Sequence, residues 1–258
     1  MKHITAGLFS LLFTFCSMQG ISQKKMSGEK IMPWTTKSKE AKDLAYKGVD
    51  HFLNIELPQA YQDFMSSLKL DPEFTIPLVF IANLSTGDTK KMYTQLAIKS
   101  AADKTGGEKL FASVVAEGNT PEENRVIWAK LVEMFPGDYI IRAFYVNTRE
   151  TPDERFATAE EYIQQFPDKA FMYNYIAYMY MNDKKEMTMA KKNFEKYIEL
   201  YPEGSNPYDS MGEYYLTIGD TEAAKKYYNM ALEKYPFNQS SLTAIQKLNE
   251  TGKTQVKN

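Results

Sequence analysis

The sequence has little of the side-chain chemistry on which most enzyme and metal sites depend. Its 258 residues include one cysteine, Cys16, and two histidines, His3 and His51. The N-terminal residues have the pattern of a removable segment, so the remaining chain would keep one histidine and no cysteine. A chain of that kind has no cysteine nucleophile, no disulfide and no Cys/His zinc site. We therefore predict no metal and no cofactor.

A surplus of positive charge is also missing. The chain carries 31 Lys and Arg against 33 Asp and Glu, and its formal net charge is −2. Nucleic-acid-binding proteins normally show a basic surplus or a basic stripe, so we predict no nucleic-acid partner. Hydrophobic residues make up 43% of the chain, which is enough for a sizeable core.

No hydrophobic run is long enough to span a membrane as a helix. The longest, residues 4–15, follows Lys2 and is followed by Gly20 and Ser22. This order is typical of a signal peptide, and we predict one over 1–22 with export to the periplasm or cell envelope. A lipoprotein signal needs a small residue directly before its cysteine, whereas Phe15 precedes Cys16, so a lipid anchor is not expected. Residues 23–39 are rich in lysine and are predicted to be a flexible leader, and 251–258 a polar tail.

From residue 40 onward, apolar residues recur at helical spacing and no strand-like alternation persists. Thr120-Pro121-Glu122-Glu123 has the pattern of a capping box, and Thr151-Pro152-Asp153-Glu154 repeats it. These and other breaks predict thirteen helices, over 40–54, 57–70, 74–85, 88–104, 107–117, 121–135, 138–148, 152–166, 169–182, 186–201, 205–218, 221–235 and 238–250.

The last helices repeat earlier ones at a spacing of 34 residues. The first and last of these units have a small residue on the first helix, and all three have small and aromatic residues on the second helix and a closing proline. The units are Gly212, Ala224, Tyr228, Ala231 and Pro236; Tyr178, Ala190, Phe194, Tyr197 and Pro202; and Gly48, Ala60, Phe64, Ser67 and Pro72.

This spacing resembles the tetratricopeptide repeat family. The resemblance implies an all-α, right-handed α-solenoid over 40–250, with about six antiparallel helix pairs and a capping helix at its C-terminal end. Tyr178 stands where a small residue is expected, so its two helices should be splayed or locally repacked. The middle units depart further: Arg155 replaces an expected alanine, and Gly106 stands where a proline is expected.

We find no catalytic motif and predict that the protein is not an enzyme. His51 falls in the interior of the first pair, without a nucleophilic-serine motif such as G-x-S-x-G. The stretch Thr105-Gly106-Gly107-Glu108-Lys109 lacks the spacing of a phosphate-binding loop and is interpreted as a helix break.

One helix is rich in tyrosine and methionine. Met172, Tyr175 and Met179 share a face of the helix predicted over 169–182. The resemblance implies that this face lines a concave groove, which continues over Asn206, Asp209 and Glu213 in the next unit. These side chains either fill the core or bind a partner segment that offers an apolar anchor and a nearby Lys or Arg. None of the six is a cation, so binding of a terminal carboxylate is not expected.

The resemblance therefore implies a non-catalytic scaffold that holds a protein or peptide segment in its groove. Two alternatives stay open. One is binding of a glycan or cell-envelope component, as in SusD-like proteins built on the same repeats, and the other is an accessory role in outer-membrane assembly.

Overall fold

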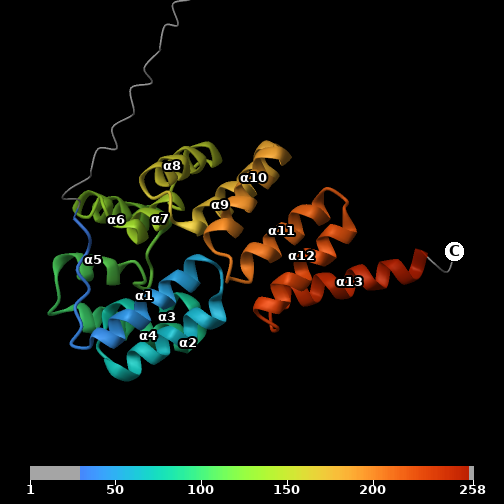
Figure 1. The fold of residues 1–258 in the computed structure, drawn as a ribbon. Helices are drawn as coiled ribbons and strands as arrows, with labels where there is room; N and C mark the ends of the chain where they lie inside the picture. Colours follow the sequence, from blue (N-terminus) through green and yellow to red (C-terminus); the bar gives the residue numbers. More distant parts are fainter. Residues whose placement is uncertain (1–29, 256–258) are drawn as a thin grey trace, which may run out of the picture.

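The fold is entirely helical in the part of the chain that the structure, a computed structural model, describes: residues 30–255, with side chains up to residue 250 (Figure 1). The thirteen predicted helices are present in this part, with ends that differ by a few residues. They are α1 Lys39–Leu53, α2 Leu57–Leu70, α3 Thr75–Leu84, α4 Gly87–Ala101, α5 Gly106–Ser113, α6 Pro121–Met134, α7 Tyr139–Val146, α8 Pro152–Gln165, α9 Ala170–Met179, the π-helical turn η1 Tyr180–Lys184, α10 Met187–Leu200, α11 Asn206–Thr217, α12 Thr221–Lys234 and α13 Gln239–Gln255.

Side-chain caps explain where several helices begin. Both predicted capping boxes are confirmed: Thr120 caps α6 and Thr151 caps α8, each with the glutamate three residues later. A third box, Thr105 with Glu108, opens α5 in the stretch that we had interpreted as a helix break. Each cap pairs backbone N–H groups that the first turn of a helix leaves without partners.

Close contact within pairs depends on glycine, as the repeat pattern predicts. A Cβ on Gly48 would lie 2.7 Å from the ring of Phe64, and a Cβ on Gly212 would lie 2.7 Å from the ring of Tyr228. No side chain fits at either position without moving an aromatic ring. The first and last pairs therefore pack in the same way, and the repeat phase inferred from the sequence is confirmed there.

The fifth pair is locally repacked, as Tyr178 predicted. The ring of Tyr178 packs edge-on against Phe194, with 5.1 Å between ring centroids. Two residues later α9 widens into η1, and Lys185, at φ 57°, ends the turn in the left-handed region. A π-helical turn of this kind rotates the following residues relative to a continuous α-helix.

Successive pairs stack into an α-solenoid whose largest core runs from the first to the fourth pair. Aromatic rings connect the pairs: Phe64 stacks on Phe80, and Trp128 stacks on Phe144, at centroid separations of 4.8 and 5.0 Å. Phe80 and Phe144 lie 5.8 Å apart and join the two stacks. A continuous series of rings therefore holds the weaker middle units in place.

The solenoid curls until its first pair touches its fifth and sixth pairs. The loop between α1 and α2 reaches the loop between α10 and α11, where Glu56 Oε1 accepts a hydrogen bond from Ser205 N at 2.7 Å. Glu56 Oε2 accepts one from Tyr201 Oη at 2.8 Å, and Tyr197 Oη donates to Asn54 O at 3.3 Å. We call this set of contacts the latch. No sequence pattern indicates it, since its partners are more than 140 residues apart.

The prediction of a flexible leader over 23–39 is wrong for residues 30–38, which pack against the helices. We call residues 30–38 the strap. Met32 is 2% exposed and Trp34 is 5% exposed, so both belong to the main core. Lys30 and Lys37 lie on either side of this alternating apolar pair and are exposed. Residues 23–29, the predicted signal peptide over 1–22 and Cys16 lie outside the described residues.

The C-terminal end also extends further than predicted. Helix α13 continues to Gln255, past the predicted end at residue 250, so most of the predicted polar tail is helical. The capping helix docks on the last pair through Ser241, which is fully buried, while the neighbouring Leu242 is 41% exposed.

Candidate functional site

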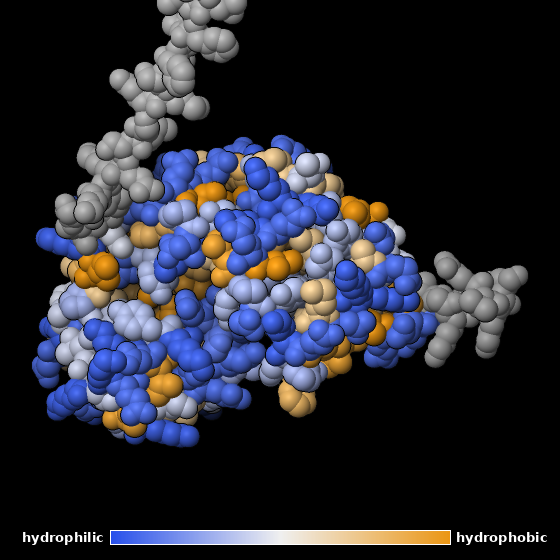
Figure 2. Space-filling view, in the orientation of Figure 1, coloured by the Kyte–Doolittle hydropathy of each residue, from blue (hydrophilic) through white to orange (hydrophobic). Residues whose placement is uncertain are grey.

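Met172, Tyr175 and Met179 line one wall of a cavity of about 420 Å³. The opposite wall comes from the end of α1 and from α7, with Phe52 and Phe144. Most of the exposed lining is apolar. Figure 2 shows a mostly hydrophilic face interrupted by an apolar patch near its centre. The structure thus brings the three predicted anchors together, although Met172 and Met179 are themselves largely buried, at 2% and 7% exposure.

Several polar side chains border this cavity, among them Arg155, Asn174 and Asp183. Asn174 is 3% exposed, and its amide oxygen has no hydrogen-bond partner. Arg155, which replaces the alanine expected from the repeat, lies at the rim and donates to the backbone oxygen of Arg149 at 3.1 Å. Asp183 of η1 lies at the rim as well. A cation therefore does border the groove, which the six residues chosen from the sequence did not include.

Asn206 and Asp209 line a second cavity, of about 460 Å³, on the other side of the α1–α2 loop. Asn206 donates to Tyr197 Oη at 3.1 Å. Asp209 is 7% exposed, and its Oδ1 accepts a hydrogen bond from Ser241. Burial raises the pKa of Asp209, and the bond from Ser241 opposes that rise. Its carboxylate is therefore engaged with α13.

Glu213 lies outside both cavities and is exposed. Its Oε2 accepts a hydrogen bond from Tyr178 Oη at 2.7 Å, which connects α11 to α9. Burial raises the pKa of Tyr178, and the nearby Glu213 carboxylate raises it further. Tyr178 lines both cavities, so it is the shared boundary between the two groups of predicted residues.

Ile55 is a site residue that the sequence did not reveal. It lines both cavities, is 57% exposed, and has φ 63°. The left-handed region is unfavourable for a β-branched residue, and such strain is concentrated at functional sites. The latch on either side of Ile55 holds this conformation, with Asn54 and Glu56 both bound to the fifth pair. No repeat pattern marks the position.

His51 lies in the first pair, as predicted, in a polar cluster next to the latch. Its Nδ1 is 2.8 Å from Asp63 Oδ2, and its Nε2 is 3.8 Å from Glu56 Oε2. Within residues 30–250, no cluster of three or more metal-ligating side chains occurs. None of the described helices combines the length and apolarity that a membrane span requires.

A family model described as tetratricopeptide repeat matches residues 210–238. The match begins in α11 just before Gly212 and includes Tyr228 and Pro236, the residues that define the last repeat unit. Residues 210–238 therefore form a tetratricopeptide repeat. The units that precede this one share its helix-pair architecture, with weaker sequence agreement in the middle of the solenoid.

The chain is similar to several solved structures. The chain is similar to a chain of the APC/C hetero-tetramer Cut9-Hcn1, with a TM-score of 0.58 and 12% identity over 83% of this chain and 42% of that one. At this identity the likeness shows the fold alone. The chain is also similar to PilW, a type IV pilus biogenesis factor, with a TM-score of 0.48 and 14% identity over 81% of this chain and 99% of that one. TTC0263 from Thermus thermophilus, a thermophilic repeat protein, gives a TM-score of 0.39 and 16% identity over 81% of this chain and 98% of that one. No curated protein matches the sequence.

Proposed function

We propose that this tetratricopeptide repeat protein is a non-catalytic scaffold that binds a segment of a partner protein in the cavity between α1, α7 and α9. Tetratricopeptide repeats are interaction modules, and the family assignment supports this general role. The specific site rests on the geometry of the cavity lined by Met172, Tyr175 and Met179.

The observation that carries the proposal is the apolar cavity itself, which Met172, Tyr175 and Met179 line together with Phe52 and Phe144. A large apolar side chain of an extended partner segment would lie between Tyr175 and Phe52. Cavities of this kind, apolar with a few polar groups, are typical binding sites.

Charge at the rim supports a partner with a basic residue beside its apolar anchor. Glu213 is the exposed carboxylate of the α9–α11 face, and Asp183 borders the first cavity. Asp209 is buried and accepts a hydrogen bond from Ser241, so a partner segment would not contact it directly. Its negative charge would act on a basic partner residue only through the electrostatic field. Lys or Arg on the partner segment would complement Glu213 at a solvated rim, where electrostatics mainly set specificity and association rate.

Selection from a displayed library of random segments tests the site. The full mature chain should enrich segments with a large apolar residue, and Tyr175→Ala should weaken their binding by about 2 kcal/mol, or roughly 30-fold, as expected for an aromatic hot spot. Tyr173→Ala is the matched control, because Tyr173 is on the same helix but lines a different surface with Lys196. Equal loss in both variants, or no loss in Tyr175→Ala, would contradict the proposal.

Export of the scaffold to the periplasm or cell envelope is part of this proposal. The basic start and the apolar run within residues 1–22 support it, because they have the order of a signal peptide.

A further inference from the structure

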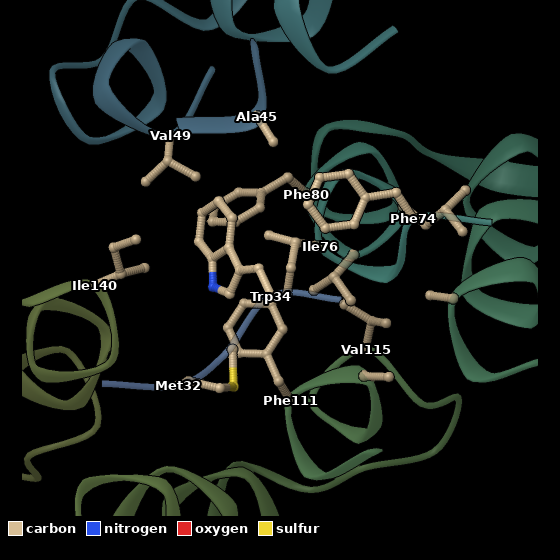
Figure 3. Close-up of a cluster of buried hydrophobic side chains, with 14 of the residues drawn as sticks. Met32, Trp34, Ala45, Val49, Phe74, Ile76, Phe80, Phe111, Val115 and Ile140 are labelled. Atoms are coloured by element: carbon tan, nitrogen blue, oxygen red, sulfur yellow. The ribbon is translucent and has the colours of Figure 1, made fainter. Parts of the chain in front are cut away.

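The strap, residues 30–38, is bound to the solenoid in the way that one molecule binds another. It runs as an extended segment across α7, α5, α3 and α1 and forms no helix of its own (Figures 1 and 3). Its side chains alternate: Met32 and Trp34 are buried, while Ile31 and Pro33 face outward, with Ile31 62% exposed. This alternation is the side-chain pattern by which extended peptides are recognised.

Trp34 is the main anchor of the strap. Its ring stacks on Tyr46 of α1 with 4.1 Å between centroids and an interplanar angle of 12°, and it meets Phe74 edge-on at 6.2 Å. Figure 3 shows Trp34 and Met32 pointing into a recess that α1, α3, α5 and α7 surround, with Ile76, Phe111 and Ile140 among its walls. The backbone approaches closely at Gly107, where a Cβ would lie 3.3 Å from Met32 Cγ.

Polar contacts fix the register of the strap. Thr35 N donates to Glu108 Oε1 at 2.7 Å, and Thr35 Oγ1 donates to Glu108 Oε2 at 2.8 Å. Met32 N donates to Asp138 Oδ2 at 3.1 Å, and Lys104 Nζ donates to Thr35 O at 2.9 Å. Two buried carboxylates and one lysine therefore recognise the strap backbone.

These carboxylates are held in place without the strap. Asp138 caps α7, because its Oδ1 accepts hydrogen bonds from Ile140 N and Ile141 N at 3.0 and 3.1 Å. Glu108 closes the capping box of α5 with Thr105. These capping bonds involve no atom of residues 30–38, so they position both acceptors independently of the strap. A preorganised site loses little conformational entropy when a ligand binds.

We propose that the strap is the resident ligand of a second segment-binding site and that an extended partner segment of the same pattern takes its place. The pattern is a large apolar residue, any residue, tryptophan and then threonine. Lys30 and Lys37 lie on either side of this pattern in the strap and are exposed. The site lies apart from the cavity of α9, so its test is independent of the proposed function.

Competition between the strap and a free peptide tests the inference in the full chain. The probe is a fluorescein-labelled peptide of residues 29–38, followed by anisotropy. The Trp34→Ala chain, whose strap lacks its main anchor, should bind the peptide. The wild-type chain should bind it at least about 100-fold more weakly, because its own strap competes at a high effective concentration. A peptide carrying Trp34→Ala should lose about 100-fold or more in affinity for the variant chain.

The matched control is the Ile31→Ala chain, which changes an exposed strap residue and should exclude the peptide as the wild type does. A folded Trp34→Ala chain that fails to bind the peptide would overturn the proposal, since the strap would then be a fixed part of the core. So would equal peptide affinities of the Trp34→Ala and Ile31→Ala chains.

Amide hydrogen exchange on the wild-type chain provides a readout that does not depend on how well a variant folds. If the strap is a replaceable ligand, Met32 N–H and Thr35 N–H exchange through a local opening at least about 10-fold more often than the central amides of α3. The same protection in both places would show that the strap opens only with global unfolding, which would refute the inference.

Discussion

The latch gives a sharp test of whether the solenoid is closed in solution. Glu56 is 6% exposed and accepts hydrogen bonds from Ser205 N and Tyr201 Oη. Glu56→Ala leaves both donors without an acceptor, and each buried donor left unpaired costs about 1–3 kcal/mol. Tyr201 is partly exposed, and removing a buried carboxylate recovers part of its desolvation cost. We therefore expect a net loss of about 2–3 kcal/mol in the free energy of unfolding.

Urea unfolding of the full chain measures this loss. Glu203→Ala is the matched control: Glu203 accepts a hydrogen bond from Lys234 at 3.1 Å on the exposed surface and should contribute no more than about 0.5 kcal/mol. A double-mutant cycle of Glu56→Ala with Tyr201→Phe should give a coupling energy of about 1 kcal/mol.

The shape of the unfolding curve carries a second readout. In a solenoid each unit contacts only its neighbours, so stability is close to a sum of local terms. The latch adds a contact between residues 149 apart, Glu56 and Ser205, which couples the two ends. Glu56→Ala should therefore also lower the m-value by making unfolding less cooperative. A variant that matches the wild type in both midpoint and m-value would show that the latch is open in solution.

Two further changes test packing and ionisation. Gly212→Ala places a Cβ 2.7 Å from the ring of Tyr228 and should lower the free energy of unfolding in urea by about 1–3 kcal/mol, whereas Gly106→Ala, with nothing within 4 Å, should change it by less than about 0.5. Equal effects would contradict the packing argument. Burial raises the pKa of Asp209, so the folded chain holds this proton more tightly than the unfolded chain, and stability falls as pH rises from about 4 through the native pKa. Asp209→Asn removes that loss, and its Tm relative to wild type should increase with pH over this range; a constant difference would refute the assignment.

The helices and their phase could be predicted because their causes are local. A capping threonine with a glutamate three residues on, or a glycine opposite an aromatic ring, leaves a pattern within one unit. Thr120 and Thr151 cap as expected, and Gly48 and Gly212 meet the expected rings. The candidate groove could be predicted in part, because helical periodicity places Met172, Tyr175 and Met179 on one face and the three residues line one cavity. Their binding role stays a prediction.

The strap and the latch could not be predicted because their causes are distant in the chain. Met32 and Trp34 form a single alternating pair among lysines, too short to show a period, and their partners lie up to 106 residues away. Glu56 is one of many acidic residues, and nothing near it indicates Ser205. The burial of Asp209 depends on Ser241, which approaches it only when α13 docks.

The strap also has a consequence for the order in which the molecule assembles. Its polar contacts lie at growing separations along the chain: 35 residues from Thr36 to Asp71, 73 from Thr35 to Glu108 and 106 from Met32 to Asp138. As the chain grows from its N-terminus, the first, third and fourth pairs present these partners in turn, so the strap can bind progressively from Thr36 toward Met32. The strap thus contacts the first four pairs one after another as they fold. Its last polar contact, from Met32 to Asp138, forms only when α7 is in place.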